Sequence, residues 1–173
     1  MSQPTVQYEK NAELFADYQT PYKLNRPILA PSGEPGDFDA LGVDNMRIFR
    51  HKGRFYATYI GFDGVGYQTA LAVSDDLIEW QKLGVIFPRG SANAWDRVGR
   101  AVSCWLHDVD LYGNRELIAK DGKYWMFYHA YPDEGYEGGS AANGLAWTED
   151  DTFHDWHFLD KPVFEKAAEG EWD

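Results

Sequence analysis

The feature of this sequence that most constrains its fold is an internal repeat. The segment Lys52–Tyr56 returns as Asp121–Trp125 after a shift of 69 positions. The segment Ala70–Trp80 returns, with changes, as Asn143–Trp156. A connector made of an apolar run and an aromatic-Asp pair occurs three times, ending at Asp39, Asp96 and Asp173. Three separate features repeated in the same order indicate two copies of one structural unit.

Each copy of the repeat is predicted to form a small antiparallel sheet. In the first copy, Arg47–Arg50 and Arg54–Ile60 flank a turn at His51-Lys52-Gly53, and Tyr67–Val73 and Trp80–Phe87 follow as further strands. Repeated four-stranded sheets of this size are the blades of a β-propeller, in which each blade buries its faces against its neighbours. We therefore predict an all-β fold with about two four-stranded antiparallel blades of a five-bladed propeller.

The predicted organisation is a lead-in followed by a partial propeller. Residues 1–26 form the lead-in, with a short N-terminal helix over Glu9–Tyr18. Residues 27–173 form the partial β-propeller, with blade one at about 40–88, blade two at about 96–165 and the start of a third blade at 166–173. Because two blades alone leave apolar faces uncovered, we expect self-association or a second chain that completes the propeller.

The charge balance excludes two classes of partner. The chain has 28 acidic residues against 16 basic ones, a formal net charge of −12. Such a chain repels phosphate backbones and anionic lipid, so we expect no nucleic-acid partner and no membrane partner. No apolar run approaches the roughly 20 residues that cross a bilayer. The first residues show no basic segment followed by an apolar one, so we see no signal peptide and expect a cytoplasmic protein.

Aromatic residues make up 16% of the chain, with seven Trp, eleven Tyr and ten Phe. Two interpretations stay open at this point. Aromatic side chains favour strands, so the rings fit a β-rich fold without any further role. Alternatively, some rings form flat platforms on which sugars stack, with carboxylates nearby that accept hydrogen bonds from hydroxyl groups.

The repeated motifs resemble those of known five-bladed propellers. The matching segments are Val43-Asp44-Asn45, Gly53-Arg54-Phe55-Tyr56, Leu71–Trp80 and Asp121–Tyr128. This pattern is similar to that of glycoside hydrolase families 43 and 32, with the phosphorylases of family 130 more distant. The resemblance runs from about Pro27 to the end of the chain. It implies a propeller with an axial pocket that acts on glycosidic bonds and binds oligo- or polysaccharide.

The resemblance also implies a first catalytic carboxylate. In these families an Asp at the inner end of the first blade's innermost strand acts as base or nucleophile. Asp44 lies nine residues before Gly53, at the spacing seen in family 32, so Asp44 is the matched residue. Asn45 stands where the family has Pro, which leaves the register open by a residue, and Asp39 is the alternative. Such a carboxylate has to face the anomeric carbon or its attacking water. The alternative structural role for Asp44 is a turn cap.

A second acid and several binding residues follow from the same resemblance. The second-blade acid that holds the sugar is matched either by Glu116, in Arg115-Glu116-Leu117, or by Asp110. We expect one of them to share a cavity with Asp44. The residues expected to contact substrate around that pocket are Asp39, Arg47, Arg115 and His129. The general acid of these families belongs to the third blade, so no residue of this chain matches it.

The expected function is that of a glycosidase, or of a partial chain of one that lacks the general acid. Two alternatives stay open: a non-catalytic propeller module that binds carbohydrate or protein, and a protein similar to the glycoside phosphorylases. We expect no resident cofactor and no assigned metal ligands. The resemblance to family 43 leaves room for a central divalent cation such as calcium, for which His107, Asp108 and Asp110 offer oxygen and nitrogen ligands.

Overall fold

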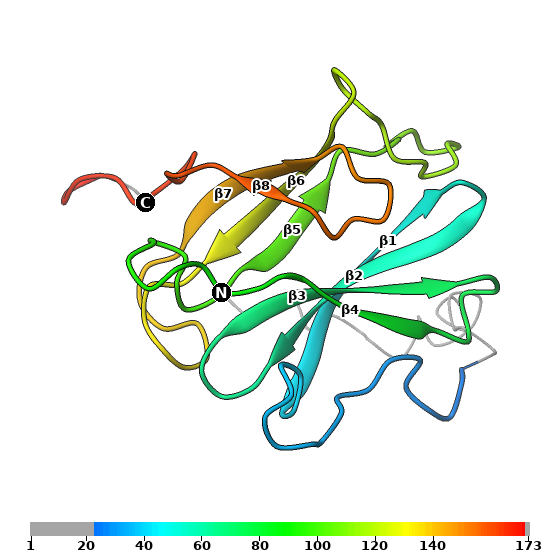
Figure 1. The fold of residues 1–173 in the computed structure, drawn as a ribbon, viewed down its shortest axis with the longest axis horizontal. Helices are drawn as coiled ribbons and strands as arrows, with labels where there is room; N and C mark the ends of the chain where they lie inside the picture. Colours follow the sequence, from blue (N-terminus) through cyan, green and yellow to red (C-terminus); the bar gives the residue numbers. More distant parts are fainter. Residues whose placement is uncertain (1–22, 172–173) are drawn as a thin grey trace, which may run out of the picture.

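The computed structural model describes residues 23–171 and contains two four-stranded sheets (Figure 1). The first has β1 (Gly42–His51), β2 (Arg54–Phe62), β3 (Tyr67–Ser74) and β4 (Gln81–Phe87) in chain order. The second has β5 (Ala101–Trp105), β6 (Tyr124–Ala130), β7 (Ala142–Thr148) and β8 (His157–Phe158), also in chain order. All neighbouring strands are antiparallel. The predicted all-β fold with two four-stranded antiparallel blades is confirmed.

Two parts of the sequence prediction fall outside the described residues. The expected helix over Glu9–Tyr18 and the third aromatic-Asp pair, Trp172-Asp173, are not described. Residues 166–171 are described and contain no strand. Within residues 23–171, no helix combines the length and the apolar composition that crossing a membrane requires.

The two sheets pack face to face and share one core. Leu71 and Phe87 of the first blade lie in the same buried cluster as Met126 and Tyr128 of the second. The edge of the Phe87 ring meets Tyr128, with 5.6 Å between ring centroids. Met126, Tyr128 and Ala130 at alternate positions of β6 point into this core, as the two-residue period of a strand requires, whereas β2 and β3 are buried on both faces.

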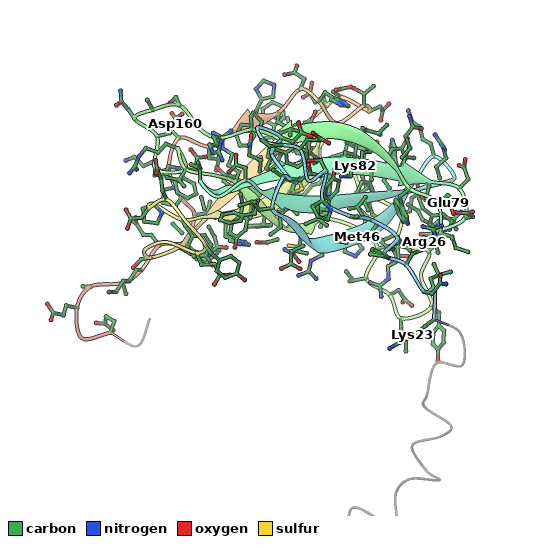
Figure 2. All side chains as sticks on the ribbon, turned by 90° about the horizontal axis from the view of Figure 1, so that it is seen from below. Lys23, Arg26, Met46, Glu79, Lys82 and Asp160 are labelled. Atoms are coloured by element: carbon green, nitrogen blue, oxygen red, sulfur yellow. The ribbon has the colours of Figure 1, made fainter. Side chains whose placement is uncertain are left out.

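The other face of blade one is covered by the lead-in segment. Tyr59, Ala70 and Ala72 form a second buried cluster against which Leu29 and Phe38 pack. Two cationic side chains tie this segment to the blade. Arg26 pairs with Glu79, which lies beside it in Figure 2. Lys82 Nζ donates to the Ala30 carbonyl at 2.8 Å. The outward face of blade two has no such cover among the described residues, and Phe127, Leu106 and Ile118 are partly exposed there.

The repeated connector explains how each blade is held to the segment before it. In blade one, Phe38 packs on Tyr59 and the carboxylate of Asp39 pairs with Lys82 Nζ at 2.5 Å. In blade two, Trp95 stacks on Tyr128, with 5.7 Å between ring centroids. There the carboxylate of Asp96 accepts hydrogen bonds from Arg100 Nε at 2.6 Å and from the Tyr128 hydroxyl at 2.8 Å. In both blades the aromatic residue of the pair therefore packs on a tyrosine of the second strand, whereas the Asp binds the fourth strand in blade one and the second strand in blade two.

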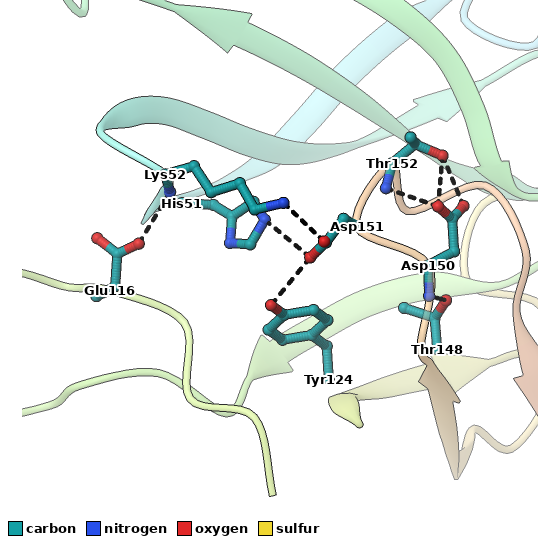
Figure 3. A network of polar contacts seen from close by, with 8 residues as sticks. All are labelled: His51, Lys52, Glu116, Tyr124, Thr148, Asp150, Asp151 and Thr152. Atoms are coloured by element: carbon teal, nitrogen blue, oxygen red, sulfur yellow. Dashed lines mark hydrogen bonds and ion pairs between the residues drawn. The ribbon is translucent and has the colours of Figure 1, made fainter. Parts of the chain in front are cut away.

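A polar network joins the blades at the tip of the β1–β2 hairpin (Figure 3). Lys52 Nζ donates to Asp151 Oδ2 at 2.6 Å, and the Tyr124 hydroxyl donates to Asp151 Oδ1 at 3.1 Å. The backbone N–H of Lys52 donates to Glu116 Oε1 at 3.0 Å. His51 Nε2 lies 3.4 Å from Asp151 Oδ1. Blade two thus supplies the two carboxylates, Glu116 and Asp151, that bind the β1–β2 hairpin of blade one.

Candidate functional site

The blades have two ends, and the residues expected to be functional divide between them. The β2–β3 turn (63–66), the β6–β7 loop (131–141) and the starts of β1 and β5 lie at one end, which we call the Tyr136 end. The β1–β2 turn (52–53) and the β5–β6 link (106–123) lie at the other, which we call the hairpin end. In Figure 1 the β6–β7 loop runs beside the β2–β3 turn, and the link runs beside the β1–β2 hairpin.

Asp44 lies at the Tyr136 end, near the start of β1. It pairs with Ile60 of β2, and the register shifts between Asp44 and Arg47. Asn45, inside this bulge, has a φ of 52°, in the left-handed region that Asn tolerates better than most residues. Asp44 Oδ1 accepts the backbone N–H of Asn45 at 2.6 Å, and Asn45 Nδ2 donates to the Val102 carbonyl at 2.8 Å. The bulge leaves the carboxylate exposed and ties its backbone to blade two.

A cavity of about 280 Å³ opens beside Asp44 and is shared by both blades. The ring of Tyr136 lies 6.1 Å from Phe62 and 6.0 Å from Tyr67, centroid to centroid, both close to perpendicular. One carboxylate, a glycine and six apolar or aromatic residues line it: Leu41, Gly42, Val43, Asp44, Ile60, Phe62, Tyr67 and Tyr136. Such a mixture suits a ligand with hydroxyl groups and partly apolar faces. A smaller cavity of about 190 Å³ lies between β1 and the lead-in and also includes Asp44.

The loop that carries Tyr136 is fixed to the first blade. The backbone N–H of Gly135 donates to the Val65 carbonyl in the β2–β3 turn at 2.8 Å, and Asp133 N–H donates to the Gly138 carbonyl at 3.2 Å. Asp63 holds the turn itself, because both of its oxygens accept Arg89 at 2.7 Å and one accepts the Val65 N–H at 2.9 Å. Burial acts to raise the pKa of Asp63, but these hydrogen bonds outweigh it and lower the pKa. The turn is therefore held by an ionised carboxylate.

His129, expected near the pocket, lies at the Tyr136 end on β6. Its Nδ1 lies 3.0 Å from Ser103 Oγ, within hydrogen-bond distance. Burial lowers the pKa of His129, and the charge of Glu137 opposes that shift only in part. The ring of Tyr131 lies between His129 and Tyr67, at centroid distances of 5.7 Å and 6.2 Å. His129 is thus a neutral imidazole at neutral pH. It does not line the Asp44 cavity itself, because Tyr131 lies between it and the lining residue Tyr67.

The structure does not bring Glu116 or Asp110 to Asp44. Glu116 lies at the hairpin end, where it bridges to Arg50, six residues along β1 from Asp44. Six strand residues span about 20 Å. The Asp110 carboxylate accepts the backbone N–H of Tyr112 at 2.9 Å within the link, as a loop-stabilising acid does. The shared cavity expected for Asp44 and either second acid is not formed within residues 23–171.

The reason for this difference is an insertion in blade two. In blade one, two residues join the inner strand to the next one; in blade two, the link of residues 106–123 joins β5 to β6. The catalytic position was sought in both blades by its number of residues before the second strand. In blade two, that count back from Lys123 ends in the link and does not reach the inner strand β5. The β-sheet register gives the true counterpart: Asp44 pairs with Ile60 in blade one, and Ala101 pairs with His129 in blade two. An alanine thus occupies the position equivalent to Asp44.

The remaining predicted residues have separate surroundings. Asp39 is 2% exposed and paired with Lys82, and Arg47 is an exposed residue of β1 that pairs with Thr58. Arg115 lies at the hairpin end with a φ of 62°, and its carbonyl accepts the Arg50 N–H at 2.9 Å. Roles of these residues in substrate binding stay predictions. Residues 23–171 contain no group of three or more His, Cys, Asp or Glu side chains placed to hold a metal ion.

Tyr67 and Tyr136 line the cavity but were not among the residues expected from the sequence. The signal available for Tyr136 was its position in the middle of the glycine-rich acidic run from Asp133 to Gly139, directly before a strand. Such loops carry binding residues on rigid scaffolds. Tyr67 had no signal of its own, because a tyrosine at the start of a strand is common.

Comparison with known proteins identifies glycoside-active proteins of the same fold. A solved glycoside hydrolase structure is 30% identical, with a TM-score of 0.70, over 93% of this chain and 47% of its own. The structure of BT0996 in an RGII complex is 29% identical, with a TM-score of 0.69, over 92% of this chain and 46% of its own. A 1,2-β-oligomannan phosphorylase from Thermoanaerobacter sp. (strain X514) is 25% identical over 114 residues, 64% of this chain and 31% of that protein.

These similarities support part of the expected family relation. The chain has the fold of propeller-type glycoside hydrolases and spans less than half the length of these relatives. A structure from the GH130 family of mannoside phosphorylases shares the fold at 20% identity and a TM-score of 0.57. No protein-family model matches the chain. Families 43 and 32 are therefore not confirmed, and the similarity reaches hydrolases and phosphorylases alike.

Proposed function

We propose that this chain forms the part of a glycoside-cleaving enzyme that binds the sugar and supplies its base or nucleophile, Asp44. The observation that carries the proposal is the exposed carboxylate of Asp44 in the lining of an aromatic-walled cavity built from both blades. Cleavage of a glycosidic bond needs a carboxylate that faces the anomeric carbon or its attacking water. Asp44 is the single carboxylate that lines this cavity among the described residues.

The chemistry of the lining favours hydrolysis over phosphorolysis. Phosphorolysis replaces the attacking water by inorganic phosphate, which needs basic side chains or backbone N–H groups to hold it. Within residues 23–171, no Lys or Arg lines the Asp44 cavity. The nearby Arg89 is engaged by Asp63 through two contacts of 2.7 Å. Water is therefore the co-substrate that the lining suits.

The general acid has to come from outside the cavity lining. Both hydrolytic mechanisms use two carboxyl groups, one of which protonates the leaving oxygen. Glu116 and Asp110 lie at the hairpin end, so neither is placed for that step. Substrates with good leaving groups, such as nitrophenyl glycosides, depend less on protonation of the leaving oxygen. They are therefore the substrates with which to test Asp44.

The test is cleavage of a panel of nitrophenyl glycosides by the intact chain, with and without inorganic phosphate. We expect turnover that is independent of phosphate and falls by roughly 10²- to 10⁴-fold in Asp44→Asn. Glu149→Gln, an exposed acid near the end of β7, is the matched control and keeps full activity. Phosphate-dependent turnover would replace hydrolysis by phosphorolysis. Glycan binding that persists in Asp44→Asn without turnover would favour a non-catalytic binding module.

A further inference from the structure

We propose that the Asp44 cavity selects a single uncharged sugar ring and that Tyr136 is the stacking residue that determines this specificity. The proposal rests on the proposed function, since it assigns the substrate class of the same cavity. It is carried by three observations: the exposure of the Tyr136 ring, the fixed loop that carries it and the distribution of charge around it.

The ring of Tyr136 is exposed to solvent and packs against two other aromatic rings. Tyr136 is 69% exposed, so its ring is open to a ligand. The rings of Phe62 and Tyr67 support it at centroid distances of 6.1 Å and 6.0 Å. An aromatic ring held in this way offers an apolar face to the C–H groups of a sugar, while the sugar hydroxyls remain free for polar contacts.

The loop is fixed before any ligand binds. The hydrogen bond from Gly135 to Val65 joins the residue before Tyr136 to blade one, and the Asp133–Gly138 hydrogen bond closes the loop on itself. A binding loop that is already ordered loses less conformational entropy on binding. Tyr136 of blade two and Asp44 of blade one therefore line the same cavity of about 280 Å³. That volume is just below the roughly 300–1,000 Å³ of sites for drug-sized ligands and suits one ring.

The charges around the cavity disfavour an anionic sugar. Asp44 lines it, and Glu137 directly follows the lining residue Tyr136 in the same loop. The carboxylate of a uronic acid would approach two like charges. Arg89 offers no compensation, because it is committed to Asp63 and to the Val98 carbonyl at 2.8 Å. The hydroxyl groups of a neutral sugar can instead donate to Asp44.

The experiment measures binding of paired sugars to the intact protein by ligand-observed NMR titration. The probes are the methyl gluco-, galacto- and mannopyranosides and the methyl uronides of the first two. We expect saturable binding of at least one neutral glycoside, with its uronide bound at least tenfold more weakly. Tyr136→Ala should raise the Kd about tenfold, and Tyr136→Phe should restore it because the ring is kept. Tyr112→Ala, a 93% exposed tyrosine at the hairpin end, is the control and should leave binding unchanged.

The outcomes separate this inference from the proposed function. A uronide that binds as well as its neutral partner overturns the inference. Binding of a neutral sugar that Tyr136→Ala leaves unchanged also overturns the inference. Both results are still compatible with the proposed function, because the chain would bind carbohydrate in either case. Absence of binding to every probe, together with absence of glycoside cleavage, overturns the proposed function and the inference with it.

Discussion

The same turn occurs in both blades with different neighbours. In blade one, Leu77 has a φ of 68° and its carbonyl accepts the indole N–H of Trp80 at 2.9 Å. In blade two, Phe153 has a φ of 61° and its carbonyl accepts the indole N–H of Trp156 at 2.7 Å. The local structure is therefore the same. Yet Leu77 is 40% exposed, and Phe153 is fully buried.

The difference arises from what lies next to each turn. Phe153 projects from blade two into a group of rings from both blades, including Phe49 and Tyr56 of blade one and Trp105 and Tyr124 of blade two. Leu77 has no blade beside it among the described residues. The comparison teaches that the repeated sequence sets the shape of the turn, whereas the position of the blade decides whether that turn contributes to the core.

The strongest test of this comparison is a matched pair of truncations. Phe153→Ala should lower the free energy of unfolding by about 3–5 kcal/mol, because it removes a large buried ring and leaves a cavity between the blades. Leu77→Ala should lower it by less than about 1 kcal/mol, since the side chain is partly exposed. Urea unfolding measures both values. Equal losses would show that the turn matters through its own conformation, not through the junction.

The second test concerns the tyrosine on which the aromatic residue of each aromatic-Asp pair packs. Tyr59 of blade one pairs with Ala70, and Tyr128 of blade two pairs with Gly144. A Cβ on Gly144 would lie 2.3 Å from Tyr128 Cζ, which is too close for any side chain. Tyr128 is fixed by Asp96 and cannot move away without losing that hydrogen bond. The glycine is thus required by the packing of the neighbouring ring.

Gly144→Ala should therefore destabilise the protein by about 1–3 kcal/mol through overpacking. The reciprocal change in blade one, Ala70→Gly, should cost about 0.5–1 kcal/mol from backbone entropy, plus the small loss of a buried methyl group. Thermal unfolding with both variants ranks the two effects. A neutral Gly144→Ala would mean that the Tyr128 ring is free to shift, and the anchoring role of Asp96 would have to be abandoned.

The smallest expected effect is on the pH dependence of stability, to which His51 of blade one, which is buried, and His129 of blade two, which is half-buried, both contribute. Burial lowers the pKa of His51, and Asp151 opposes that shift in part; burial likewise lowers the pKa of His129. As the pH falls below the ordinary value of about 6.5, the unfolded protein binds protons before the folded one does. The free energy of unfolding should therefore decrease as the pH is lowered from about 7.5 to about 5.5.

Replacing either histidine should reduce that decrease. His51→Gln and His129→Gln each remove one of the two groups, so each variant should show a shallower pH dependence of stability than the wild-type chain. Equilibrium unfolding at a series of pH values measures the slopes. A wild-type stability that is flat over this range would mean that both histidines stay as accessible to protons when folded as when unfolded.

Much of the fold could be predicted from the sequence because the repeat and its turns are local signals. The predicted β2, β3 and β4 differ from the observed strands by one or two residues. The start of β1 was placed at Arg47 and is at Gly42, because the bulge around Asn45 hides the alternation of the strand. A bulge depends on the partner strand, which the sequence of one strand does not reveal.

The candidate site could be predicted only in part. Asp44 and His129 lie at the same end of the blades, as the expected pocket requires. Glu116 and Asp110 lie at the opposite end. They were chosen by their distance in sequence from β6, and the inserted link of residues 106–123 occupies that distance. Tyr136 contributes from the other blade through a loop, and a contact between two blades has no signature in the sequence of either one.

The hydrogen bond from Gly135 to Val65 has a mechanical consequence. Tyr136 lies on the β6–β7 loop of blade two, and this bond ties that loop to the β2–β3 turn of blade one, so the position of the loop depends on both blades. Phe153 and the Lys52–Asp151 pair join the same two blades at the hairpin end. A substitution at Phe153 that shifts one blade against the other would therefore strain the Gly135–Val65 hydrogen bond and move Tyr136, although Phe153 itself does not line the cavity.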